Sequence, residues 1–155
     1  MASRNATLSA MAELVLVKAE DCLPLRQSVL RPGLPEKESV YPNDNNDRST
    51  HYAMRHRKQT LGVISMLHEP RGDVGSEMYR IRGLAVLPEH QRQGLGTTLL
   101  KTIQTIATKR GGGLWANVRE SAVPFYARAG FVAEGEEFDL KGIGAHRLMT
   151  WRPAP

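Results

Sequence analysis

The sequence predicts a single α/β (or α+β) domain in which helices flank one central sheet. Candidate strands and helices follow one another in the order β-α-β-β-β-α-β-α-β-β, and neither a repeat nor a linker divides the 155 residues. Hydrophobic residues make up 41% of the chain and charged residues 24%, as in ordinary globular proteins, which excludes wholesale disorder.

The first third of the chain predicts one strand, one helix and a long irregular segment. We predict a strand at Glu13–Val17 and a helix at Leu23–Leu30, which Arg31–Gly33 would end. Further prolines and a cluster of Asn and Asp keep the next stretch irregular. Only Met1–Ser9 and Pro153–Pro155 are expected to be loose, which leaves an ordered core of about residues 13–152.

The remaining two thirds predict most of the sheet. His51–Arg55 and Thr60–Leu67 are expected to form a hairpin, and Met78–Leu87 is the longest strand candidate. The spacing of apolar residues predicts a helix at Leu95–Arg110, with Gly111 just past its end. A strand, a short helix and two strands complete the chain: Leu114–Val118, Ser121–Ala129, Phe131–Glu134 and His146–Trp151.

The composition limits the partners and the compartment. The 21 Lys and Arg against 16 Asp and Glu give a net charge of +5, which fits either a solvated basic surface or an anionic ligand. Cys22 is the single cysteine, so no intrachain disulfide can form. No apolar run reaches the length of a membrane span and no signal peptide is evident. We therefore expect a cytoplasmic protein without a membrane partner.

The first candidate site is the loop Gln91-Arg92-Gln93-Gly94-Leu95-Gly96, between the long strand and the helix that follows it. The first N–H groups of a helix have no partner within the helix, and the helix dipole adds positive potential there. Two glycines would let a pyrophosphate approach the backbone, and Arg92 could add a charge-assisted contact. A glycine-rich turn without a ligand is the alternative. Thr97 after Gly96 excludes a P-loop, and Leu99 stands where a dinucleotide fingerprint needs a small residue.

The second candidate site follows the strand Leu114–Val118. Asn117 lies at the end of this strand, and the run Phe125-Tyr126-Ala127-Arg128-Ala129-Gly130-Phe131 leads from a short helix into the next strand. Gly130 is the expected end of that helix. Taken alone, the run is also consistent with two core phenylalanines and a tyrosine of an ordinary amphipathic helix.

Together the two motifs resemble the GNAT N-acetyltransferase superfamily in their order and spacing. The residues that carry the resemblance are Leu84-Ala85-Val86, Gln91–Gly96, Asn117 and Phe125–Phe131. Three further segments resemble small stand-alone members of the superfamily: Leu30–Gly33, Arg82–Ala85 and Gly135–His146. The resemblance extends from Glu13 to Arg152.

The resemblance implies a mixed, mostly antiparallel sheet with a splay between the fourth and fifth strands, and acetyl-CoA as the co-substrate. The long strand would pair with pantetheine and the loop would hold the pyrophosphate, while Asn117 would approach the pantetheine arm and Tyr126 the sulfur. The cofactor-binding residues implied in this way are Leu84, Ala85, Val86, Gln91, Arg92, Gln93, Gly94, Leu95, Gly96, Thr97, Asn117 and Tyr126.

Acyl transfer to an amine also needs a base and an acceptor site. Tyr126 would donate to the departing sulfur in a direct transfer. The base is left open between His146, Glu77 at the start of the long strand and a water-mediated relay, because the long strand lacks the glutamate that many relatives use. Arg82 on the long strand, and Arg31 in a loop that borders the acceptor site in the family, are candidates to clamp a carboxylate. A surface or structural role is the alternative for each of His146, Arg82 and Arg31.

The function predicted is that of an acetyl-CoA-dependent N-acetyltransferase acting on a primary amine of a small acceptor with an acidic group. The missing glutamate favours one alternative, a CoA-binding sensor or regulatory protein that has lost its chemistry. A nucleic-acid partner is not expected, because the chain lacks a basic and aromatic platform. No histidine or cysteine spacing marks a metal site, so no metal is expected, and a homodimer is left open.

Overall fold

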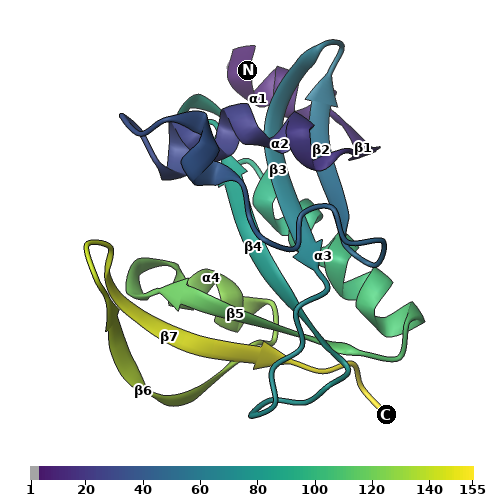
Figure 1. Cartoon of the computed structure of the whole chain (residues 1–155). Helices are drawn as coiled ribbons and strands as arrows, with labels where there is room; N and C mark the ends of the chain where they lie inside the picture. The colour runs from purple at the N-terminus through teal and green to yellow at the C-terminus, as the bar shows by residue number, and fades with distance from the viewer. Residues whose placement is uncertain (1–3) are drawn as a thin grey trace. The chain divides into compact units, whose positions relative to one another are not determined.

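The computed structural model of the protein describes residues 4–155 (Figure 1). Its strands are β1 (Glu13–Val17), β2 (Thr50–His56), β3 (Gln59–Leu67), β4 (Met78–Val86), β5 (Gly113–Arg119), β6 (Val132–Leu140) and β7 (Gly144–Trp151). The α-helices are α1 (Arg4–Ala10), α2 (Ala19–Leu25), α3 (Leu95–Lys109) and α4 (Val123–Arg128). Shorter helical segments are the π-helical η1 (Arg26–Leu30) and the 3₁₀ turns η2 (Glu36–Ser39), η3 (Pro88–His90) and η4 (Glu120–Ala122).

The strands of the described chain form one seven-stranded sheet in the order β1-β2-β3-β4-β5-β7-β6. The pairs β1–β2, β2–β3, β5–β7 and β6–β7 are antiparallel, whereas β4 and β5 are parallel. The parallel ladder is short, since it joins Met78–Arg80 to Gly113–Trp115. The mixed, mostly antiparallel sheet expected from the sequence is therefore confirmed.

The chain forms two compact units, and β4 and α3 contribute residues to both. The first unit holds the residues up to His68 together with Ile81–Thr102. The second unit holds Glu69–Arg80 together with Ile103–Pro155.

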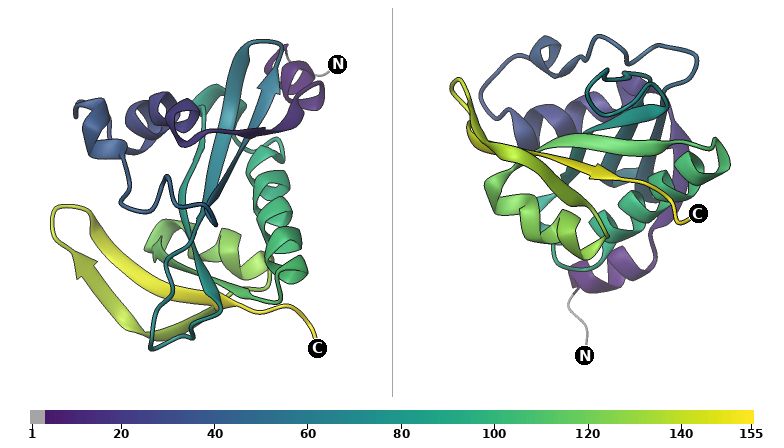
Figure 2. Two further views of the ribbon diagram at one scale, coloured as in Figure 1. Left: turned by 45° about the vertical axis from the view of Figure 1, so that its right-hand side comes forward. Right: turned by 90° about the horizontal axis from the view of Figure 1, so that it is seen from below.

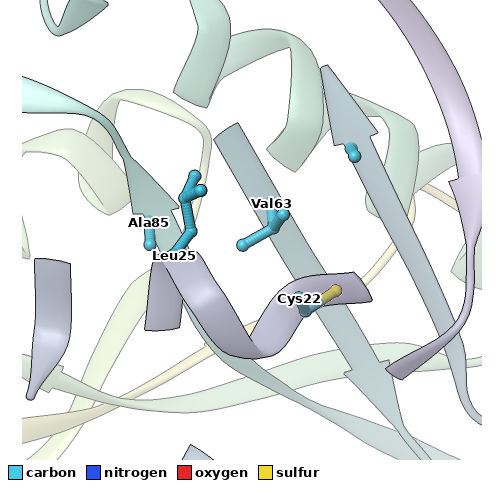
Figure 3. Close-up of a cluster of buried hydrophobic side chains, with 5 residues drawn as sticks. Cys22, Leu25, Val63 and Ala85 are labelled. Carbon is cyan, nitrogen blue, oxygen red and sulfur yellow. The ribbon is translucent and has the colours of Figure 1, made fainter. Parts of the chain in front are cut away.

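In the first unit, helices cover both faces of β3, which is why this strand is almost wholly buried (Figure 2). One face carries a cluster under α2 (Figure 3), formed by Cys22, Leu25, Ala53, Val63 and Ala85. On the other face, a Cβ added to Gly62 would lie 3.2 Å from the Leu99 side chain of α3. The absence of a side chain at Gly62 thus lets α3 pack closely on the strand.

The second unit has its own small core. Val74, Met78 and Trp115 form a buried cluster, and the partly buried Leu148 packs against it. The Trp115 indole N–H donates to the backbone carbonyl of Glu69 at 2.8 Å, so the polar atom of this large side chain is satisfied.

The N-terminal segment differs from its prediction. Met1–Ser9 was expected to be loose, but α1 spans Arg4–Ala10, and Met1–Ser3 lies outside the described residues. A seven-residue helix is not stable on its own in water, so α1 depends on the contacts that it makes. The prediction is wrong because such contacts leave no periodic pattern in so short a segment.

Two further elements begin or end elsewhere than predicted. α2 begins at Ala19 rather than Leu23, because the Lys18 backbone N–H donates to the Asp21 carboxylate at 2.9 Å and caps the helix. β6 extends to Leu140 rather than Glu134, although most of its residues are exposed. This edge strand is held by its ladder with β7, which no alternation of apolar residues reveals.

Candidate functional site

The loop between β4 and α3 has a strained backbone. Arg92 has a φ of +62° and Gly94 a φ of +87°, so both residues lie in the left-handed region. Helix α3 starts at Leu95, and its first intrahelical bond runs from the Thr98 N–H to the Gly94 carbonyl at 3.0 Å. The preceding N–H groups, from Leu95 to Thr97, have no acceptor within the helix.

The start of α3 suits an anionic ligand. A Cβ added to Gly94 would have no other atom within 4 Å, so the loop is open at this residue. The first turn of α3 contains no acidic residue that could compete for its N–H groups. The Oε1 atom of Gln93 is buried and has no hydrogen-bond partner; as an acceptor it needs an N–H or O–H donor, which a pyrophosphate does not supply. The open loop and the absence of a competing carboxylate fit a pyrophosphate held on backbone N–H groups.

The end of β4 is tied to the same loop. The Gln91 side-chain amide donates to the Val86 carbonyl at 3.0 Å, and the Leu87 N–H donates to the Leu61 carbonyl of β3 at 2.9 Å. Of the three predicted residues on β4, Ala85 is buried, while Leu84 and Val86 are half-buried. All the predicted cofactor residues from Leu84 to Thr97 thus lie in the first unit.

A buried ion pair lies beneath β4 in the same unit. The Arg26 guanidinium, which is 0% exposed, donates to both carboxylate oxygens of Asp44, at 2.8 and 2.9 Å. It also donates to the Ser39 carbonyl at 2.9 Å and to the Ser65 hydroxyl at 2.7 Å. A buried bidentate pair with these extra hydrogen bonds holds its geometry firmly.

His51 closes this network and has a structural role. Its Nε2 donates to the Asp44 backbone carbonyl at 2.8 Å, because a carbonyl can only accept. Burial lowers the pKa of His51, which favours the neutral ring. Its Nδ1 then accepts the hydrogen of the Ser65 hydroxyl at 2.6 Å.

This network positions Arg82, one of the two predicted acceptor residues. The ring of Tyr41 lies between two guanidinium groups, with its centroid 4.1 Å from Arg26 Cζ and 3.9 Å from Arg82 Cζ. Gly83, with a φ of +68°, makes room, because a Cβ there would lie 2.9 Å from Arg26 Nε and 3.2 Å from Tyr41. Tyr41 and Arg26 could not be predicted from the sequence, since nothing in the local pattern links them to β4.

Arg31, the other predicted acceptor residue, also belongs to the first unit. It is half-buried at the end of η1, and its backbone N–H donates to the carbonyls of Arg26 and Gln27 at 3.2 and 3.1 Å. Its convergence with Arg82 on one acceptor stays a prediction.

Hydrogen bonds at the C-terminal end of α4 hold the backbone at Tyr126 in place. The Phe131 N–H donates to the Tyr126 carbonyl at 3.1 Å and the Gly130 N–H donates to the Ala127 carbonyl at 3.0 Å, which is a Schellman motif. Gly130 has the φ of +94° that this motif requires, so its predicted role at the helix end is confirmed. The rings of Tyr126 and Phe131 meet edge to face, with centroids 5.2 Å apart. Burial raises the pKa of Tyr126 well above its ordinary range, so the phenol keeps its proton.

His146 has a defined tautomer. Its Nδ1 donates to the Gly144 carbonyl at 2.8 Å, which leaves the lone pair of the neutral ring on Nε2. The side chain is 5% exposed and its ring lies 6.1 Å from that of Phe138. An imidazole fixed in this way can accept a proton at Nε2.

Asn117 and His146 lie on the same face of the second unit's sheet. The register of β5 with β7 is continuous from Leu114↔Trp151 to Arg119↔His146, and Asn117 pairs with Leu148. Paired residues project to one face, as do residues two apart, so Asn117 is a diagonal neighbour of His146. The Oδ1 atom of Asn117 is buried without a partner, as expected of a group that serves a ligand.

Tyr126 belongs to the opposite face of these strands. Trp151 projects from the face opposite to Asn117 and stacks on Phe131, with ring centroids 6.4 Å apart. Since Phe131 packs against Tyr126, the tyrosine lies on the Trp151 side. The second unit therefore groups Asn117 with His146 and separates both from Tyr126.

Other reactive groups in the described chain are few. The buried thiol of Cys22 has a pKa raised to about 11, chiefly by desolvation, so it is not a thiolate nucleophile at neutral pH. Across residues 4–155, no group of three or more His, Cys, Asp or Glu side chains could hold a metal ion. In the same part of the chain, no helix is both long and apolar enough to cross a membrane.

Comparison with known proteins identifies the family. Residues 34–152 match the family model described as "Acetyltransferase (GNAT) domain". The chain is 28% identical over 141 residues to YitI, an uncharacterised N-acetyltransferase of Bacillus subtilis (strain 168). The aligned region covers 90% of this chain and 95% of YitI.

Solved structures agree with this match. The fold is similar to that of the ribosomal-protein-S18-alanine N-acetyltransferase from Escherichia coli, with a TM-score of 0.73 and 20% identity, over 92% of this chain and 94% of that one. It is also similar to an aminoglycoside 6'-N-acetyltransferase complexed with coenzyme A, with a TM-score of 0.68 and 15% identity, over 92% and 99% of the two chains. The family match covers most of the sequence, and the chain belongs to the GNAT acetyltransferase family.

Proposed function

We propose that the protein transfers the acetyl group of acetyl-CoA directly to the primary amine of a small acceptor that carries an acidic group. The observation that carries the proposal is the start of α3 after Gly94, where the first N–H groups have no acceptor within the helix, the loop is open and no carboxylate competes. Acetyl-CoA supplies an activated thioester, and the cytoplasm is the compartment in which we expect the protein to act.

The cofactor contacts follow from the free polar groups. The N–H groups of Arg92 to Thr97 would hold the pyrophosphate, with Arg92 adding positive charge, while the Gln91 N–H already donates to the Pro88 carbonyl. The backbone of Leu84, Ala85 and Val86 would pair with the pantetheine arm. Asn117 carries an unpartnered Oδ1 that suits an amide N–H of the same arm.

The residues of the second unit would divide the proton chemistry. Tyr126, with its raised pKa, is a neutral donor that stabilises negative charge on sulfur by a hydrogen bond. His146 Nε2 carries the lone pair that can accept the proton of the attacking amine. The two residues lie on opposite faces of the same strands, so the role of each is a separate hypothesis that needs its own variant.

The acceptor would be recognised by charge. Arg82, held against Tyr41 over the buried Arg26–Asp44 pair, is suited to clamp a carboxylate, and Arg31 would add a second cation. A carboxylate-bearing amine also fits the net charge of +5, which would repel a polycationic acceptor.

A CoA-binding regulator without catalysis remains the second candidate, favoured by one observation. Strand β4, Met78–Val86, contains no carboxylate that could act as a base. Both candidates predict CoA binding, so turnover decides between them. Release of the free CoA thiol from acetyl-CoA, measured across a panel of amino acids and other small amines, should exceed the rate without an amine only in the enzyme.

Binding of CoA is expected to raise the melting temperature. A ligand that binds only the native state at 100 times its Kd contributes about 2.7 kcal/mol, or roughly 5–10 °C for a chain of this size. Because the pyrophosphate should dominate binding, free CoA is expected to act nearly as well as acetyl-CoA, and pantetheine much less. An unchanged melting temperature at saturating CoA would remove the loop from the proposal.

Arg82→Ala is expected to weaken the acceptor and to spare acetyl-CoA. Loss of a half-buried, charged contact should raise the KM of an acidic acceptor about 10-fold, or 1.4 kcal/mol. Lys58→Ala, which removes one positive charge from the exposed β2–β3 turn, should leave both KM values unchanged. Steady-state kinetics with each substrate varied separately would measure this, and equal effects on both KM values would reject the carboxylate clamp.

A further inference from the structure

We propose that α1 is a brace for the cofactor loop, and that Ser9 and His90 are the positioning residues through which it acts. The inference rests on the proposed use of this loop to hold CoA, and it assigns a role to a helix that precedes the first strand of the sheet. Helix α1, Ser9, His90 and the loop that follows His90 all belong to the first unit.

The contact joins two side chains that are far apart in the sequence. The Ser9 hydroxyl lies 3.1 Å from Nδ1 of His90, and α1 packs against η3. Ser9 is 6% and His90 2% exposed, so water does not compete for this hydrogen bond. If either the Ser9 hydroxyl or the His90 ring were removed, the other would lose this buried hydrogen bond.

The strained part of the loop follows two fixed residues: Gln91, whose side-chain amide donates to the Val86 carbonyl, and His90. The His90 N–H donates to the Leu87 carbonyl at 2.9 Å, and Leu87 is in turn bound to β3. Two residues later Arg92 adopts a φ of +62°, a conformation that a residue with a Cβ keeps only when its surroundings impose it. The start of α3 fixes the other end of the loop, from Gly94 onward.

The Ser9–His90 hydrogen bond therefore controls the direction of the backbone N–H groups in the cofactor loop. If His90 could move, Arg92 would relax toward an ordinary conformation and the N–H groups from Arg92 to Gly94 would change direction. The loop would still exist, but it would have to be reordered each time a pyrophosphate bound, at a cost in affinity. Catalysis at saturating acetyl-CoA would not change.

The test compares two Ser→Ala variants of the full chain. Ser9→Ala removes a hydroxyl that bonds His90, whereas Ser39→Ala removes a buried hydroxyl of the same unit that has no partner. Calorimetry should show the Kd for CoA raised about fivefold in Ser9→Ala and unchanged in Ser39→Ala, while kcat stays the same in both. Introducing Ser9→Ala into a His90→Phe variant should raise Kd no further, because the two residues act as one unit.

Hydrogen exchange in the absence of any ligand separates this inference from the proposed function. The amides of Arg92 to Gly94 should exchange faster in Ser9→Ala than in the wild type and in Ser39→Ala. If the wild type binds no CoA, the proposed function fails, whereas faster exchange still supports the brace. A lower melting temperature with unchanged Kd and unchanged exchange in the loop would overturn the inference, since it would make Ser9 a residue of stability alone.

Discussion

Gly94→Glu is expected to abolish CoA binding while leaving the chain folded. Gly94 lies directly before α3, next to the first N–H groups of the helix, which have no acceptor within it. A Cβ built at Gly94 would have no other atom within 4 Å. A glutamate would therefore fit without a clash and would place its carboxylate where the pyrophosphate should lie. Like charges at this short distance, together with capture of the N–H groups by the new carboxylate, should raise Kd beyond the measurable range. Calorimetry and a thermal-shift assay with CoA would measure the loss.

Controls must separate charge from strain, because any residue with a Cβ is strained at the φ of +87° of Gly94. Gly94→Gln carries the same strain and nearly the same volume without the charge, and should bind CoA weakly but measurably. Gly111→Glu places the same side chain at a similar φ of +72°, also in open space, beyond the other end of α3. It should bind CoA as the wild type does. If Gly94→Glu retains normal affinity, the loop does not hold the pyrophosphate.

The predictable parts of the fold are those with a strong local signal. The Leu95–Lys109 helix has an apolar stripe and a glycine just past its end, and the structure shows a Schellman motif there, with the Gly112 N–H donating to the Ala107 carbonyl at 3.0 Å. The β2–β3 hairpin has a two-residue turn between apolar strands. Periodicity and turn chemistry act within a few residues of each other, so the sequence displays them directly.

The unpredicted parts depend on contacts between distant segments. Arg26 pairs with Asp44 and contacts the half-buried Tyr41, which in turn contacts Arg82 of β4, but irregular structure separates these residues in the chain. A buried arginine is unusual, and its presence in a predicted helix offers no signal of its partner. The same holds for Ser9, whose partner His90 is 81 residues away. The residues that touch the ligand could thus be proposed from motifs, whereas those that position them could not.

Most residues of the motif at Phe125–Phe131 are explained by the way α4 ends, without any catalytic role. The Schellman motif explains Gly130, and the ring contact that accompanies it explains an aromatic residue at 126 and another at 131. Phenylalanine would satisfy both requirements at position 126. The hydroxyl of Tyr126 is the one feature of the motif that the helix end does not need, which makes it the atom to test.

Tyr126→Phe is expected to lower kcat about 100-fold with little change in acetyl-CoA affinity, since acid–base groups contribute about 10²–10⁴-fold and a phenol is a weak match to a thiolate. The ring keeps its edge-to-face contacts with Phe125 and Phe131, so the packing of α4 survives. The hydroxyl matters only as negative charge develops on sulfur, and its loss should therefore appear in kcat and not in KM. Because burial raises the pKa of Tyr126 far above neutrality, the wild-type pH profile should show no loss of activity from its ionisation at moderately alkaline pH.

Steady-state kinetics with a competent amine, together with a melting curve, would measure the effect of Tyr126→Phe. Tyr52→Phe, which removes a hydroxyl from a half-buried tyrosine of β2, is the matched control and should keep full activity. If Tyr126 serves only the packing of the core, Tyr126→Phe should change the melting temperature modestly and leave kcat unchanged. That result would leave the tyrosine as part of the helix end and would require another group to stabilise the departing thiolate, because the pKa of the free thiol, about 8.5, makes expulsion at neutral pH unfavourable without a donor.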